Sequence, residues 1–169
     1  MSLKRFLFLS IPISFLVITA GFGSAAEKIE MGGWGKGSEY NQRYQASETD
    51  DFKGEVVAIR EVVPMPGMSP GVALEVREGK GKDAETILVH LCPAWFADPK
   101  SIGIKKGDQV KIKGVWAEIE GKDVFMASKV KKGDHFEFKV RLTKDGTPFW
   151  TMSKEELAKE RAESQMSKG

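Results

Sequence analysis

The sequence predicts an all-β domain, because short segments with alternating apolar and polar residues recur between turn signals. The clearest examples are residues 72–77 and 136–142, in which every second side chain is apolar. Residues 94–104 interrupt the run after the third predicted strand and indicate a turn of helix followed by a loop. Three strands, a short helical insert and further strands form the order of a small OB-type barrel, which closes its sheet and removes exposed edges.

Each predicted strand ends at residues that interrupt a β-ladder. Residues 64–71 contain three prolines and two glycines and are expected to form a loop. Gly114 lies within a predicted strand and indicates a bulge or a bend of the barrel. Glu120-Gly121 and Asp145-Gly146 are typical of tight turns between antiparallel strands. The expected strands cover residues 52–63, 72–77, 87–92, 110–118, 124–130 and 136–142.

The predicted barrel spans residues 51–151 and has an extension at each end. Residues 27–50 form an N-terminal arm rich in glycine and aromatic residues, which is either flexible or pinned to the barrel by Trp34, Tyr40 and Tyr44. Residues 152–169 are expected to form a solvated C-terminal helix. Ser153 and Glu156 have the spacing of a capping box at its start.

Residues 1–26 have the features of a signal peptide. Lys4 and Arg5 precede an apolar stretch, and Ser24-Ala25-Ala26 offers small residues for cleavage. The sequence therefore predicts a periplasmic or secreted protein with no membrane segment after cleavage, although a retained anchor is the alternative. Cleavage would remove two basic residues and no acid, leaving equal numbers of basic and acidic residues.

Five segments resemble, in their order and spacing, the signature segments of small exported bacterial OB-fold proteins. These are residues 52–56, 66–72, 89–95, 107–114 and 145–150. The resemblance covers residues 34–151 and implies an OB fold with no settled biochemical activity. That family usually has Gly at the position of Cys92 and often His at that of Ala73, so this chain departs from the pattern at both.

The sequence contains no phosphate-binding glycine loop, haem-attachment motif or clear catalytic group, so no enzyme and no cofactor are expected. A rigid barrel that presents loops favours a binding or adaptor module. Its partner would be an unknown small molecule or an envelope protein, bound at a rim formed by residues 64–71, residues 90–95 and the arm. The candidate ligand-binding residues are Trp34, Tyr40, Met65, Met68, His90 and Trp95.

His90 and Cys92 form the candidate metal site, because alternate side chains on one strand share a face. An imidazole and a thiolate can both reach a soft metal ion such as copper or zinc, and Met65 and Met68 would favour Cu(I). A hydrogen-bonded histidine beside a buried thiol is the preferred interpretation. The single Cys excludes an intramolecular disulfide.

Single-stranded nucleic-acid binding is a further alternative. The expected face of the second and third strands carries no aromatic side chain for base stacking, and a net-neutral chain offers no general basic surface. Trp95, Trp116 and Trp150 are expected to pack the barrel ends or to hold the arm. A basic strip is possible, but a solvated face is preferred for its members, Lys129, Lys131, Lys132, Lys139 and Arg141.

Overall fold

A computed structural model describes residues 31–166, so the predicted signal peptide lies outside the described residues. Three short 3-10 turns, η1 (Ala46–Glu48), η2 (Gly81–Asp83) and η3 (Phe149–Thr151), accompany two helices, α2 (Glu39–Gln42) and α3 (Lys154–Met166). The strands are β1 (Thr49–Val62), β2 (Gly71–Glu78), β3 (Glu85–Pro93), β4 (Gln109–Ile119), β5 (Lys122–Lys132) and β6 (Phe136–Lys139).

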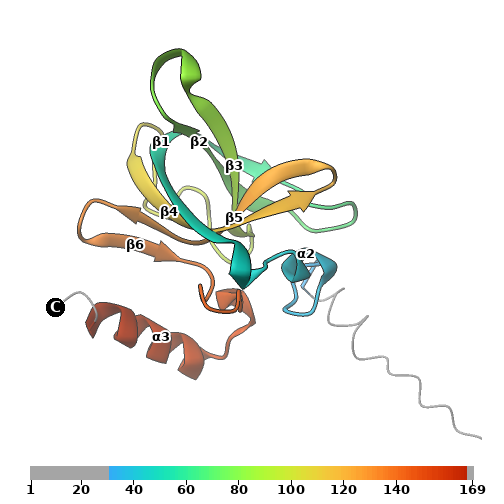
Figure 1. The fold of residues 1–169 in the computed structure, drawn as a ribbon. Coiled ribbons are helices and arrows are strands. Elements are labelled where there is room, and N and C mark those ends of the chain that lie inside the picture. The colour runs from blue at the N-terminus through green and yellow to red at the C-terminus, as the bar shows by residue number, and fades with distance from the viewer. Residues whose placement is uncertain (1–30, 167–169) are drawn as a thin grey trace, which may run out of the picture.

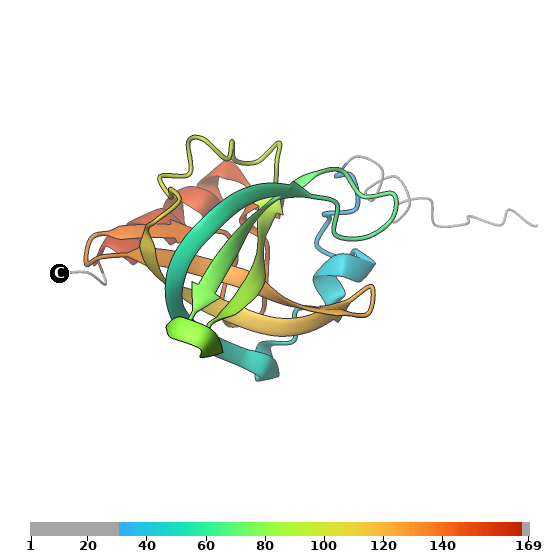
Figure 2. The same cartoon turned by 90° about the horizontal axis from the view of Figure 1, so that it is seen from above.

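The first five strands close into a ring. β1 pairs antiparallel with both β2 and β4, β2 pairs with β3, and β4 pairs with β5. A short parallel pairing of β3 with β5, at Val89 and His90, completes the ring (Figure 1, Figure 2). β6 extends the sheet beyond β5. This order confirms the predicted small all-β barrel of OB type.

Two glycines allow the strands to bend around the barrel. Gly54 lies where β1 passes from its pairing with β4 to its pairing with β2, and a Cβ there would lie 2.5 Å from the Arg77 carbonyl oxygen. The predicted irregularity at Gly114 is confirmed, because the register with β5 shifts between Lys113 and Gly114. A Cβ at Gly114 would lie 2.1 Å from the Met126 carbonyl oxygen, so only glycine fits.

Alternate side chains of the strands fill the barrel interior, as the sequence pattern predicted. Each such burial contributes about 1.5–3 kcal/mol relative to an exposed side chain. The fully buried members include Val56, Val72, Leu74, Val76, Val89, Leu91, Ile112 and Phe125.

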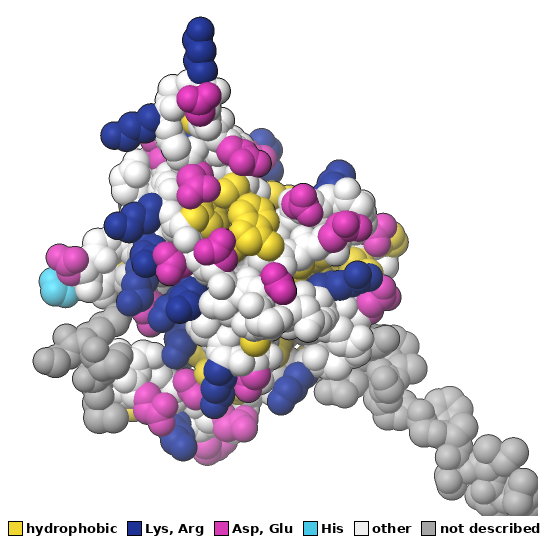
Figure 3. All heavy atoms as spheres, viewed as in Figure 1, with side chains coloured by type: hydrophobic (Ala, Val, Ile, Leu, Met, Phe, Trp, Pro, Cys, Tyr) yellow, Lys and Arg dark blue, Asp and Glu magenta, His cyan; other side chains and the backbone are white. Residues whose placement is uncertain are grey.

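Strands β1, β4 and β5 contribute an aromatic cluster to the barrel. Trp116 stacks on Phe52 with ring centroids 6.5 Å apart and meets Phe125 edge-on at 5.2 Å. The Trp116 indole N–H donates to an Asp50 carboxylate oxygen at 3.3 Å. Trp116 therefore packs on two buried aromatic side chains of the barrel while its own side chain is 38% exposed. Figure 3 shows a hydrophobic surface on the upper part of the barrel in this view, with acidic side chains around it.

The insert between β3 and β4 is a series of turns, so the prediction of a helical turn there is wrong. The Asp98 carboxylate accepts from the Lys100 backbone N–H at 2.8 Å, and such local side-chain bonds compete with helix formation.

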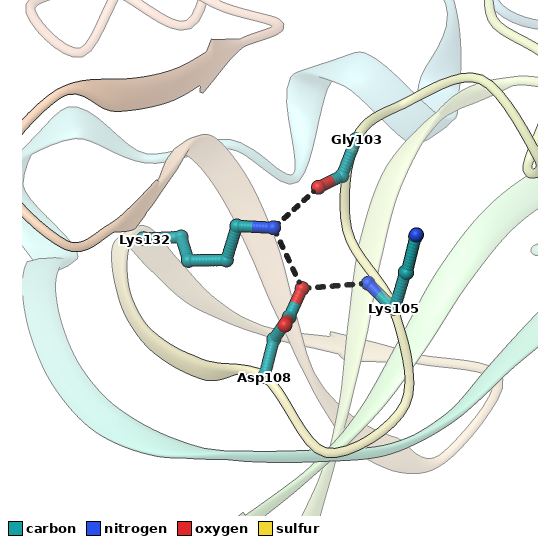
Figure 4. A network of polar contacts seen from close by, with 4 residues as sticks. All are labelled: Gly103, Lys105, Asp108 and Lys132. Carbon is teal, nitrogen blue, oxygen red and sulfur yellow. Dashed lines mark hydrogen bonds and ion pairs between the residues drawn. The ribbon is translucent and has the colours of Figure 1, made fainter.

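Lys132 of β5 anchors the insert (Figure 4). Its ammonium donates to the Gly103 carbonyl at 2.7 Å and to Asp108 at 3.0 Å, and Asp108 also accepts from the Lys105 N–H at 2.8 Å.

The last predicted strand ends earlier than the alternation suggests, at Lys139. The backbone N–H groups of Val140 and Arg141 both donate to the Ser128 carbonyl, at 2.8 and 3.1 Å. Two consecutive residues therefore face inward, and Arg141 is fully buried. The preferred assignment of Arg141 to a solvated face is therefore wrong.

α3 lies beside β6 on the outside of the barrel (Figure 1). The capping box is confirmed, because the Ser153 N–H donates to a Glu156 carboxylate oxygen at 2.8 Å and the Glu156 N–H donates to Ser153 Oγ at 3.2 Å. Most of its described side chains are exposed, which agrees with a solvated helix. Within residues 31–166, no helix is both long and apolar enough to span a bilayer.

Candidate functional site

A buried arginine connects the arm to the barrel. The guanidinium of Arg141 lies 4.7 Å from the Trp150 ring and 5.8 Å from each of the Tyr40 and Tyr44 rings. It donates to the Asn41 side-chain oxygen and, at 3.4 Å, to the Gly146 carbonyl. Among the described residues no carboxylate pairs with it, and its Nε and Nη2 lack hydrogen-bond partners. Three aromatic rings therefore replace a counter-ion.

Trp34 holds the start of the arm and is fully buried. Its indole N–H donates to the Ser69 carbonyl at 2.9 Å, and its own carbonyl accepts from the Trp150 indole at 2.8 Å. A Cβ at Gly71 would lie 2.3 Å from the Trp34 ring, so glycine permits this close approach. The pinned form of the arm, and not the flexible form, is the one that the described residues adopt.

Tyr40 covers the face of β2 and β3 on which OB barrels commonly bind ligands. Its hydroxyl forms a 3.2 Å hydrogen bond with His90 Nδ1, and both side chains are buried. Ala73, the register partner of His90 on β2, is also fully buried. The sequence pattern found no aromatic residue on these strands, and the arm supplies one.

Burial keeps Tyr40, His90 and Cys92 neutral near pH 7. Burial, with a smaller contribution from the Arg141 cation, lowers the pKa of His90 to about 4. Burial raises the pKa of Cys92 to about 12 against the opposing effect of Arg141. Burial likewise raises the pKa of Tyr40 to about 12. None of the three side chains is therefore ionised.

The copper or zinc site at His90 and Cys92 stays a prediction. An irregularity at Leu91 interrupts the strand alternation between the two residues. Metal binding needs the thiolate, which burial disfavours here, and the nearby Arg141 cation opposes a metal cation. In residues 31–166 no three His, Cys, Asp or Glu side chains gather in a group that could hold a metal ion.

A groove of about 440 Å³ separates the arm from the β1–β2 loop. The Ser69 N–H donates to the Gly32 carbonyl at 2.8 Å and fixes the loop against the arm. Gly33 has φ +85°, and a Cβ there would lie 2.7 Å from Met68 Cγ. The lining of this arm groove comprises Gly32, Gly33, Ser38, Glu39, Tyr40, Met65, Pro66, Gly67 and Met68.

The candidate ligand-binding residues divide into three groups. Tyr40, Met65 and Met68 line the arm groove. Trp95 is 54% exposed and follows Ala94, whose N–H donates to the Pro70 carbonyl at the end of the same loop. Trp34 and His90 are buried and do not line the groove.

Sequence reasoning missed Arg141 as the centre of the region. Its position in an alternating apolar–polar pattern gave no sign of burial, because the rings that surround it come from distant segments. The Asn41 side chain that bonds it is 100 residues away in the chain. The spacing of Tyr40, Tyr44 and Trp150 offered no local signal either.

Comparison with known proteins identified one family. The model of the MamS/MamX magnetosome protein family matches residues 48–137, which is just over half of the chain and covers the barrel from η1 to the start of β6. No curated protein and no solved structure matched. The predicted resemblance to bacterial barrel proteins is confirmed at the level of a bacterial family, and export stays a prediction. The chain belongs to the MamS/MamX magnetosome protein family.

Proposed function

We propose that this chain is a non-catalytic, exported binding module of the MamS/MamX family that docks a segment of another envelope protein in the arm groove. The observation that carries the proposal is the groove itself, in which Met65 and Met68 face an arm fixed by buried aromatic side chains. A site whose walls are already ordered loses little conformational entropy on binding.

The chemistry of the groove suits an extended, largely apolar peptide segment. Methionine side chains adapt to irregular apolar partners. Glu39, whose side chain is 64% exposed, can receive a basic residue of that segment in exchange for its 3.3 Å ion pair with Arg43. The exposed Trp95 adds a large aromatic contact near the same loop, and tryptophan is frequent among residues that dominate interface energies.

The neutral state of the buried polar side chains supports a non-catalytic role. A Cys–His pair acts as a nucleophile only when the thiol is readily deprotonated. Burial raises the pKa of Cys92 to about 12 and lowers that of His90 to about 4, which opposes formation of a thiolate–imidazolium pair.

Export rests on residues 1–26. Cleavage after Ala26 would give a mature chain that begins at Glu27. Sequencing the N-terminus of the protein recovered from the native envelope tests this part of the proposal. A cytoplasmic chain that begins at Met1 would contradict it.

A photo-crosslinking residue placed at Met68 tests the groove. We expect a discrete adduct with one envelope protein in native cells, joined through an apolar segment of that partner. The same residue at Lys122, in the β4–β5 hairpin outside the groove, is the matched control. Identical adducts from both positions, or none from Met68, would contradict the proposal.

Purified partner should then bind the Met68→Glu variant at least about tenfold more weakly than wild type, because a charge would be buried among apolar groups.

A further inference from the structure

A second cavity lies between α3 and the barrel and shares no lining residue with the arm groove. Its volume is about 370 Å³. The elements that enclose it are the insert, β6, η3 and α3, which are far apart in sequence and adjacent in the fold (Figure 1). The lining of this α3 pocket comprises Phe96, Ala97, Glu137, Phe138, Lys139, Phe149, Arg161 and Ser164.

The wall of the α3 pocket on the barrel side is aromatic. Phe96 meets Trp150 edge-on at 5.8 Å, and Phe149 is almost fully buried. Phe138 is half-buried on β6. The three phenyl rings are therefore held by the barrel and not by α3.

Among residues 154–164 of α3, no apolar side chain lines the pocket. Leu157 is the only apolar side chain of α3 that is partly buried among its described side chains, and it does not line the pocket. Across the pocket, Lys139 of β6 makes polar contacts with α3: its ammonium pairs with Glu160 at 3.6 Å and donates to Ser164 Oγ at 3.2 Å. An aromatic wall thus faces a helix that meets it mainly through polar groups.

The charge available in the α3 pocket is positive. Arg161 is exposed and has no ion pair with a described carboxylate. Lys139 lies 5.7 Å from the Phe149 ring centroid and shares its charge with Glu160, so Arg161 supplies the unpaired positive charge. Glu137 is the one acid in the lining, and Lys131 pairs with it at 3.4 Å.

We propose that the α3 pocket binds a free alkyl carboxylate of about ten carbons. Its carboxylate would accept hydrogen bonds from Arg161 and Lys139, and its chain would lie on the phenyl rings. The cavity has room for about twelve non-hydrogen atoms if each occupies the share of one water molecule, about 30 Å³. A decanoate ion has that size. The proposal is independent of the function assigned to the arm groove.

Titration of the purified protein with decanoate tests this assignment. Binding is followed by amide chemical shifts and by tryptophan fluorescence, because Trp150 contacts Phe96 in the wall of the pocket. We expect saturable binding with shifts confined to the pocket and to α3. Decanol, which keeps the chain and lacks the charge, should bind about tenfold more weakly, because a charge-assisted hydrogen bond is worth at least that factor. Equal binding of decanol and decanoate would overturn the proposal.

Two substitutions on α3 test whether Arg161 binds the carboxylate. Arg161→Gln should weaken decanoate about tenfold and leave decanol unchanged. Lys154→Gln, an exposed position on the same helix outside the pocket, should change neither. An unchanged decanoate affinity in Arg161→Gln would overturn the proposal. So would protein that sediments with anionic vesicles but shows no affinity for free decanoate, which would assign the cations to a membrane surface. Far-ultraviolet circular dichroism verifies that both variants keep the helix.

Discussion

The arm and α3 are both attached to the outside of the same barrel, and they are held in different ways. The described part of the arm contains a four-residue α-helix and a three-residue 3-10 turn, yet it buries Trp34, Tyr40 and Tyr44. α3 is thirteen residues long and exposes most of its described side chains. Short helices are marginal in water without tertiary packing. From this comparison we expect buried aromatic area, and not the length of regular structure, to decide which extension unfolds together with the barrel.

Removing the largest arm anchor should have the largest effect. Trp34→Ala should lower the free energy of unfolding by about 3–5 kcal/mol, because it empties a fully buried site and removes the hydrogen bond to Ser69. Urea denaturation measures this. Trp95→Ala is the matched control, since its side chain is 54% exposed, and should cost less than about 1 kcal/mol. Equal losses in the two variants would show that the arm is not part of the cooperative unit.

Arg141 allows the contribution of shape to be separated from that of charge. Arg141→Ala should cost about 2–4 kcal/mol, because it leaves a cavity between three rings. Arg141→Met keeps much of the volume and removes a buried cation without a carboxylate partner, so its stability should stay within about 1 kcal/mol of wild type. Denaturation of both variants checks the difference. A methionine variant as unstable as the alanine variant would mean that attraction between the cation and the rings exceeds the cost of burying the charge.

The covered histidine should make the arm sensitive to acid. The pKa of His90 is about 4 in the folded chain and 6.5 in its ordinary state, so the unfolded chain binds the proton first as the pH falls. The contribution of neutral His90 to the free energy of unfolding is therefore fully present above pH 6.5. It should decline by about 2–3 kcal/mol on approach to pH 4. Hydrogen bonds lower the pKa values of Asp51, Asp108 and Asp145 below 3.8, so these carboxyls reduce stability mainly below pH 4.

Denaturation midpoints between pH 7 and pH 4 measure the effect. His90→Gln should flatten the profile within this window, whatever its stability at pH 7. His135→Gln, at an exposed position of the β5–β6 turn, should retain the wild-type slope. A slope that survives in His90→Gln would assign the acid sensitivity to another group.

The barrel could be predicted because its signals are local. Alternation along Val72 to Arg77 identifies an interior face within six residues, and Glu120-Gly121 has positive φ angles of 52° and 71°, as a tight hairpin requires. Gly114 could be placed at a bulge for the same reason. These features depend on neighbours in sequence, so each could be deduced before the fold was known.

The surroundings of Arg141 could not be predicted, because they depend on contacts between distant segments. Its alternation with Val140 and Leu142 predicted a surface position. In the structure, the N–H groups of Val140 and Arg141 both donate to the Ser128 carbonyl, and Arg141 faces inward. The family match ends at residue 137 and begins at residue 48, so it covers neither Arg141 nor the arm residues that surround it. The surroundings of Arg141 are therefore assembled by segments on both sides of the matched residues.

Two serine caps give the finest test of the contrast between the extensions. Ser38 Oγ accepts from the Asn41 N–H at 3.2 Å and is buried, whereas Ser153 caps the exposed α3. Ser38→Ala should cost about 1 kcal/mol of global stability, because α2 is coupled to the barrel through Tyr40 and Asn41. Ser153→Ala should reduce helicity but change the global free energy of unfolding by less than about 0.5 kcal/mol, since a fraying helix opens without the core. Urea denaturation and circular dichroism at 222 nm separate the two quantities. A global loss in Ser153→Ala as large as that in Ser38→Ala would show that α3 unfolds together with the barrel, and the contrast between the extensions would then rest on surface exposure alone.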